Sequence, residues 1–224
     1  GTRVSTYMRG NESTSNGVLN YVGVIDVAAG DVLKVQEILT SGAQVTYQGG
    51  SIEIVQLPAS AKTFIREATT GDQNPASLTE FSWDSTAHID TDTFTINSAT
   101  DSFTEVDAAG DYLFFWSAWT DSSAPTRGKP SAALSVNDTL VNYGLSARYH
   151  RFNGTDNRAG HSNGAFVPSM SAGDDVSVEV IGLSAAGSMN VSHGAHSGLR
   201  LDTLYATAAP ATTLSVSGTL ISLP

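Results

Sequence analysis

The sequence predicts an all-β fold. Val, Thr, Ser, Ala and Gly are abundant, stretches rich in Leu, Glu and Lys are missing, and turn-forming clusters recur at intervals of roughly 8–12 residues. The motif AAGD occurs at 28–31 and 108–111, and the similar motif SAGD occurs at 171–174. Each motif precedes apolar and β-branched residues. Gly readily adopts positive φ, and the Asp carboxylate can accept hydrogen bonds from nearby backbone N–H groups. Each motif therefore predicts a tight turn that leads into a strand. The turn residues are Gly30, Asp31, Gly110, Asp111, Gly173 and Asp174.

The strands are expected where β-branched and aromatic runs lie between turn residues. The predicted strands are Ser77–Ser85, Asp92–Ile96, Ser102–Val106, Asp111–Trp119, Ser131–Val136, Thr139–Tyr143, Ser146–Phe152, Gly164–Pro168, Asp175–Ile181 and Gly198–Leu204. Val136–Asp138 is predicted as a hairpin turn and Phe152–Asn157 as a loop. A short helix near Val32–Leu39 is the only helical candidate, and the turn before it favours a strand.

Composition excludes several classes of function. The chain has 22 acidic and 11 basic side chains among 224 residues, a formal net charge of −11, which argues against nucleic acid and anionic membranes as partners. Cysteine is absent, so neither a disulfide nor a thiolate metal site is expected. No apolar run approaches the roughly 18 residues of a membrane span, and membrane insertion is not expected.

The chain aligns with itself. Residues 4–17 lie over 145–160, with Tyr7 on Tyr149 and Arg9 on Arg151, and 31–38 then match 174–181. The alternating segment 49–57 closes the first copy as 196–204 closes the second. Ordered matches with near-equal spacing indicate an internal repeat. We therefore expect residues 1–58 to be the C-terminal half of a first sandwich domain, residues 59–206 to be a complete domain, and residues 207–224 to be an extended tail.

Half a sandwich exposes an apolar face and unpaired strand edges. The first copy is therefore expected to be completed by further sequence in the natural protein or by another chain. The tail begins with an Ala/Thr/Pro linker and continues into the apolar segment 213–223. Two interpretations of the tail remain open: strand addition to a neighbouring sheet edge, or a frayed end or start of another domain.

Several segments together resemble a known superfamily. FTEVDAAGDYLFFWSAW (103–119), SAALSVNDTLV (131–141), SMSAGDDVSVEV (169–180) and SGLRLDTL (197–204) are similar to the jelly-roll domain of the complement globular-head and tumour necrosis factor superfamily. The Tyr-Arg-Asn strand and the Ser/Thr/Asn-rich texture also resemble tandem domains of tailed-phage virion proteins. The resemblance implies an antiparallel jelly-roll β-sandwich that forms trimers. A collagen-like stalk and cysteine are absent, which argues against a vertebrate-type signalling role.

The strand Asp111–Trp119 is apolar on both faces. One face carries Tyr112, Phe114, Trp116 and Ala118, and the other carries Leu113, Phe115, Ser117 and Trp119. A strand of this kind is normally covered on both faces. The second face is expected to meet a neighbouring subunit of a homotrimer, with long loops of the same chain as the alternative. The candidate interface residues are Phe115, Trp119, Tyr149 and Arg151.

No catalytic, cofactor or metal site is predicted. His193 and His196 are spaced i, i+3 in a β region, so a solvated loop is favoured over a metal site. The acidic residues Asp84, Asp90, Asp92 and Asp101 lack the Gly and Glu of a calcium loop, so an acidic surface is favoured. Catalytic motifs in a supporting context are missing, and we do not expect an enzyme.

Two classes of function remain open. The first is a structural protein of a virion surface, such as a capsid decoration, spike or fibre component, which assembles as a homotrimer with other virion proteins outside the cell. The second is an adhesion module of a phage tail or bacterial surface that binds a host-surface glycan or receptor. In that case Trp83, Trp119 or Tyr143 is the expected stacking platform.

Overall fold

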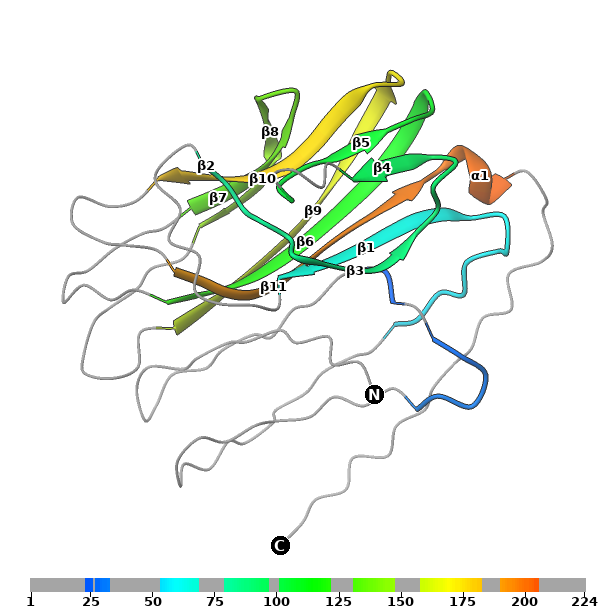
Figure 1. The fold of residues 1–224 in the computed structure, drawn as a ribbon, viewed down its shortest axis with the longest axis horizontal. Helices are drawn as coiled ribbons and strands as arrows, with labels where there is room; N and C mark the ends of the chain where they lie inside the picture. Colours follow the sequence, from blue (N-terminus) through cyan, green and yellow to red (C-terminus); the bar gives the residue numbers. More distant parts are fainter. Residues whose placement is uncertain are drawn as a thin grey trace, which may run out of the picture.

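The computed structural model describes residues 23–25, 27–32, 53–68, 79–96, 101–121, 131–147, 158–182 and 190–205. Within these ranges two antiparallel β-sheets pack face to face (Figure 1). Several predictions lie outside the described residues. They are the first-copy segments 4–17 and 33–52, with most of the helix candidate Val32–Leu39, the residues Tyr149 and Arg151, the loop Phe152–Asn157, and the tail 207–224.

One sheet has five strands. Their spatial order is β3 (Ser85–Ile89), β1 (Lys62–Ala68), β11 (Asn190–Arg200), β6 (Gly110–Asp121) and β9 (Arg158–Met170). Each neighbouring pair is antiparallel. We call this the β6 sheet.

The second sheet contains six strands. Its main path is β4 (Phe94–Ile96), β5 (Thr104–Val106), β10 (Asp174–Gly182), β7 (Ser131–Val136) and β8 (Thr139–Ala147), and β2 (Thr79–Glu80) pairs with β10 beside this path. All pairings are antiparallel. We call this the β10 sheet. The short helix α1 (Asp202–Tyr205) follows β11.

The chain crosses repeatedly between the two sheets. From β5 it enters the β6 sheet at β6, returns for β7 and β8, crosses to β9, returns as β10, and ends as β11 between β1 and β6. Antiparallel strands that alternate between two packed sheets in this way form a jelly roll. The predicted all-β, antiparallel jelly-roll β-sandwich is therefore confirmed.

Several element boundaries differ from the sequence-based prediction. Within the described part of the predicted strand Ser77–Ser85, Thr79–Glu80 form β2 and Ser85 begins β3, because the chain between them turns inward to bury Phe81 and Trp83. The predicted strands Thr139–Tyr143 and Ser146–Phe152 are joined in one strand, β8 (Thr139–Ala147), and residues 148–152 lie outside the described residues. The predicted last strand ends at Arg200, and helix α1 follows where a continued strand was expected.

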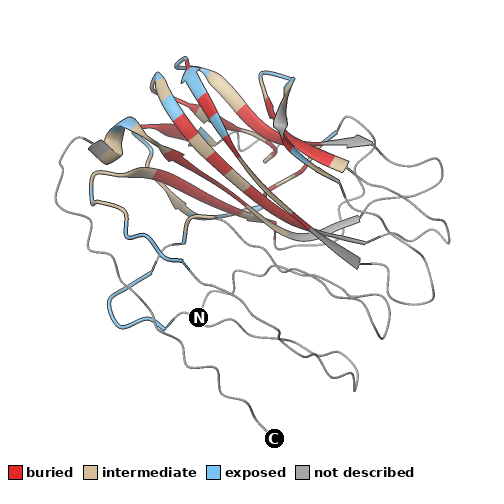
Figure 2. Ribbon diagram, turned by 180° about the vertical axis from the view of Figure 1, so that it is seen from behind, coloured by how far each residue is buried: buried red, intermediate tan, exposed pale blue. Residues whose placement is uncertain are grey.

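The hydrophobic core lies between the sheets (Figure 2). Strand β6 contributes its inward face, where Tyr112, Phe114, Trp116 and Ala118 are all at most 3% exposed. From the β10 sheet the facing side chains are those of alternate strand positions, including Val176, Val178 and Leu134. The predicted division of β6 into two faces agrees with this burial.

Two turns share one geometry. Gly30 and Gly173 have φ of 93° and 92°. Asp31 Oδ2 accepts a hydrogen bond from the Ala28 N–H at 2.8 Å, and Asp174 Oδ2 accepts one from the Ser171 N–H at 2.7 Å. In both turns the Asp N–H also donates to the backbone carbonyl three residues earlier, at 3.1 Å.

The third motif, AAGD at 108–111, has a different backbone geometry. Gly110 is the first residue of β6 and is not among the described glycines with positive φ, so a positive-φ turn at this glycine was a wrong expectation. Asp111 also has a different partner from Asp31 and Asp174. Its Oδ1 accepts the Ser169 N–H at 2.8 Å, which ties the start of β6 to the end of β9.

Candidate functional site

The outer face of the β6 sheet is closed on one side and open on the other. On the β1 and β11 side, Ile65, Ser197 and Leu199 are between 4% and 7% exposed. The Val24 N–H donates to the Ser197 hydroxyl at 3.3 Å, so residues of the N-terminal segment lie against this side. The alternative of coverage by the chain itself therefore holds for this part of the face.

The open side is an apolar edge patch, defined as Leu113, Phe115 and Phe166. Leu113 is directly opposite Phe166 in the β6–β9 pairing, and Phe115 is two positions along the same face. The Phe115 ring lies over Gly164, where an added Cβ would be 2.7 Å from the ring. Phe166 is 44% exposed, and Leu113 and Phe115 are half-buried. The patch therefore presents aromatic surface at the last strand of the sheet.

The side chains predicted for the interface are only partly described. Phe115 lies in the apolar edge patch. The Trp119 backbone pairs with His193 and Gly160, but its side chain lies outside the described residues, as does that of Tyr143. Trp83 is 1% exposed within the core, so its assignment as a stacking platform for an external ligand was wrong. The residue is inside because the chain at 81–84 turns into the space between the sheets.

A polar cluster occupies the core near Trp83. Arg66 is fully buried, and its guanidinium donates to the carbonyl oxygens of Phe103 at 2.9 Å, Trp83 at 2.8 Å and Asp101 at 3.0 Å. The Asp101 carboxylate lies 3.6 Å from Nη2. Burial lowers the pKa of Arg66 and the Asp101 charge opposes that shift, so the carbonyls and the carboxylate together hold a buried cation.

His196 lies beside this cation. The residue is fully buried in β11, edge-on to Phe64 with 5.0 Å between ring centroids, and neither ring nitrogen has a hydrogen-bond partner. Burial, with a smaller contribution from the Arg66 charge, lowers the pKa of His196 to about 3. The expectation that His196 lies in a solvated loop was wrong, because β11 is a central strand and this position faces inward.

The predicted acidic surface is also partly structural. Asp90 Oδ2 accepts the Thr63 N–H at 2.8 Å, and Asp101 contacts Arg66. Asp92 is exposed and pairs with Lys62 at 2.6 Å, and this hydrogen bond lowers the pKa of Asp92. In the described ranges no three His, Cys, Asp or Glu side chains converge to hold a metal ion. No helix in the same ranges has the length and apolarity to cross a membrane.

Comparison with known proteins finds no matching family model and no matching curated protein. Three solved structures illustrate what the chain is similar to. The globular domain of zebrafish complement 1qA is 14% identical over 61% of this chain and 94% of its own, with a TM-score of 0.42. Murine APRIL at pH 5.0 is 12% identical over 63% and 99%, with a TM-score of 0.44. The Eiger TNF of S. frugiperda is 14% identical over 70% and 98%, with a TM-score of 0.43.

Proposed function

We propose that this chain is a non-enzymatic structural protein that assembles as a homotrimer through the apolar edge patch. The exposed aromatic surface at β9 carries the proposal. Phe166 is 44% exposed beside the half-buried Phe115, on the last strand of a sheet whose other side is already covered. Aromatic residues gathered on an exposed edge are typical of an interface between subunits. The superfamily resemblance of the sequence supports a threefold arrangement.

A virion surface is the proposed location. The support is the Ser/Thr/Asn-rich, acidic, cysteine-free sequence and its resemblance to tandem jelly rolls of tailed-phage virion proteins. In such a setting the protein is a capsid decoration, spike or fibre component that contacts other virion proteins. Mass spectrometry of purified virions tests this location, and consistent absence from particles whose genome encodes the chain contradicts it.

The oligomeric state is tested by size-exclusion chromatography with light scattering. The wild-type chain is expected at three times its 23.3 kDa mass. Phe166→Asp should give monomers, because a buried carboxylate without a partner opposes association. Leu145→Asp is the matched control, since Leu145 is 46% exposed on the other sheet and should leave the trimer intact. A monomeric wild-type chain at micromolar concentration, or equal effects of both variants, refutes the interface.

A further inference from the structure

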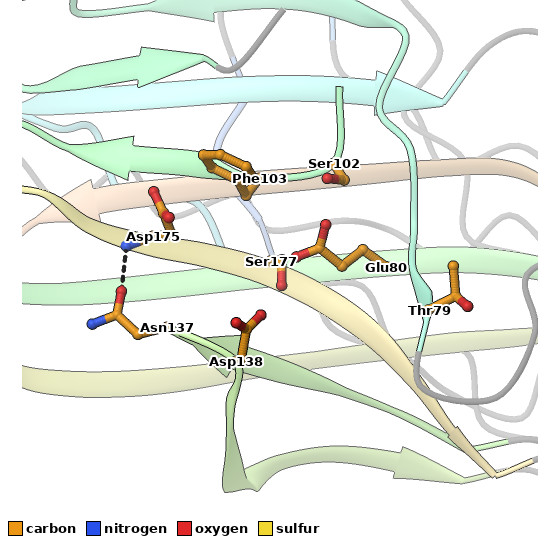
Figure 3. Close-up of a pocket in the computed structure, with 8 residues that line it drawn as sticks. All are labelled: Thr79, Glu80, Ser102, Phe103, Asn137, Asp138, Asp175 and Ser177. Carbon is orange, nitrogen blue, oxygen red and sulfur yellow. Dashed lines mark hydrogen bonds between the residues drawn. The ribbon is translucent and has the colours of Figure 1, made fainter. Parts of the chain in front are cut away.

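A hollow of about 470 Å³ lies on the outer face of the β10 sheet (Figure 3). Strand β2, the segment before β5, the β7–β8 hairpin and β10 contribute its walls. We call it the acidic groove, and its lining residues are Thr79, Glu80, Ser102, Phe103, Asn137, Asp138, Asp175 and Ser177.

Negative charge gathers on this face because of the register of β10. Val176 and Val178 are buried in the core, so Asp175, Ser177 and Glu179 project outward. Antiparallel pairing then sets Glu105 opposite Asp175 and Glu80 opposite Glu179. The hairpin turn adds Asp138, whose φ of 58° fits the tight two-residue turn.

These carboxylates have no basic partner in the part of the chain that the structure describes. Within the described ranges, ion pairs join Asp90, Asp92, Asp101 and Asp202 to basic side chains, and none of these acidic residues lines the acidic groove. Carboxylates directly opposite one another in a sheet repel. Burial, followed by the charges of Glu105, Glu80, Asp138 and Asp174, raises the pKa of Asp175. Among the described residues, the negative charge of the groove is therefore not balanced by basic side chains.

Buried polar atoms without partners provide a second observation. Ser177 lines the groove and is 4% exposed. Ser135 lies directly opposite Ser177 on the same outer face, is fully buried, and its hydroxyl has no hydrogen-bond partner. Asp175 Oδ1 is likewise buried without a partner. Groups of this kind are normally satisfied, and an N–H donor that enters the groove would satisfy Asp175 Oδ1.

The spacing of the carboxylates in the acidic groove indicates what kind of ligand it can bind. The carboxylates do not converge on one point, since no metal-holding group of three is found among the described residues. They are distributed along a groove, which suits separate cationic donors on an extended chain. A second copy of this chain is a poor occupant, because its net charge is −11.

We propose that the acidic groove binds a basic, extended segment of a partner protein. Lysine or arginine side chains of that segment contact Glu80, Asp138 and Asp175, and their N–H groups reach the unpaired Asp175 Oδ1. The apolar edge patch is on the other sheet, so this inference is independent of the proposed trimer and either one can fail alone.

Fluorescence anisotropy tests the inference on the full chain. The probe is a labelled peptide of alternating Lys and Ser at low ionic strength, and the reference peptide has Gln in place of each Lys. The groove variant is Glu80→Gln with Asp175→Asn. The matched control is Glu53→Gln with Glu67→Gln, which removes the same charge away from the groove.

The Lys peptide should bind the wild-type chain and the Gln peptide should not. The groove variant is expected to weaken binding by roughly tenfold, whereas the control pair should change it less than about twofold. Equal losses in both variants would show attraction to overall charge and overturn the proposal, as would no binding of the Lys peptide. If calcium alone displaces the peptide at one ion per chain, the site is a metal site and the proposal is wrong.

A measurement on the wild-type chain keeps the test independent of variant folding. Peptide added to ¹⁵N-labelled protein should shift the amide signals of 79–80, 137–138 and 175–177. Shifts confined to other residues overturn the proposal. Thermal unfolding of the groove variant should occur at or above the wild-type temperature, because like-charge repulsion is removed.

Discussion

Acidification should destabilise the fold through His196. The pKa of this residue is about 3 in the folded chain, against an ordinary value of 6.5 when the chain is unfolded. The unfolded state therefore binds the proton first as the pH falls below 6.5. Stability from the neutral imidazole is complete above pH 6.5 and is lost progressively toward pH 3.

The magnitude follows from the width of this window. Each pH unit between the two pKa values corresponds to about 1.4 kcal/mol, so the His196 contribution lost between pH 7 and pH 5 is about 2 kcal/mol. The main physical cause is burial, which disfavours the protonated ring, and the Arg66 charge adds a smaller repulsion. His196→Leu removes this titration and places an apolar side chain of similar volume at the site.

The assay is urea unfolding at pH 7, 6 and 5, followed by the fluorescence of the buried Trp83 and Trp116. The quantity compared is the change in unfolding free energy with pH, which cancels the different starting stabilities of the two proteins. Wild type should lose about 2 kcal/mol more than His196→Leu between pH 7 and pH 5. Identical pH slopes in the two proteins would refute the argument that His196 is neutral and buried.

Five further variants test the turns and the core packing by urea unfolding. Gly173→Val and Gly30→Val should each destabilise the surrounding region by about 1–3 kcal/mol through backbone strain alone, since φ is near 92° and no atom lies within 4 Å of the added Cβ; wild-type stability in either variant argues against this strain. Arg66→Met should cost about 3 kcal/mol because it leaves buried carbonyl oxygens unpaired, and Arg66→Lys should recover only part of the loss. Gly198→Ala should cost about 1–3 kcal/mol, because its Cβ would overlap the Phe64 ring. Tolerance without loss would mean that the ring moves freely.

The alternation of inward-facing and outward-facing residues along the strands made much of the fold predictable from the sequence. In β6 the aromatic residues at every second position mark the core face, and the bounds predicted for β7 match the structure. Strand β1 was not predicted, because Arg66 occupies an inward position and interrupts the apolar pattern. Only the tertiary structure supplies the carbonyl oxygens that make a buried guanidinium tolerable there.

His196 and the acidic groove illustrate the limits of a single sequence. The segment SHGAHSG is rich in small and polar residues and resembles a loop, yet it is part of strand β11. Its Gly198 has no side chain, which leaves space for the rings of Phe64 and Phe114. The groove combines residues from β2, the β7–β8 hairpin and β10. These segments are distant in the chain, so their charges come together only through strand pairing.

The position of β11 has a consequence for synthesis of the chain. Strand β11 lies between β1 and β6 and pairs with both, although Lys62 and its partner Arg200 are separated by most of the domain. On the ribosome β1 and β6 emerge long before the strand that joins them, so the β6 sheet cannot close until residues 190–200 have left the exit tunnel. Until then the faces that carry Phe64 and Phe114 are exposed in the nascent chain. We therefore expect slow, late closure and a requirement for protection from aggregation during translation, as in other folds dominated by pairings distant in sequence.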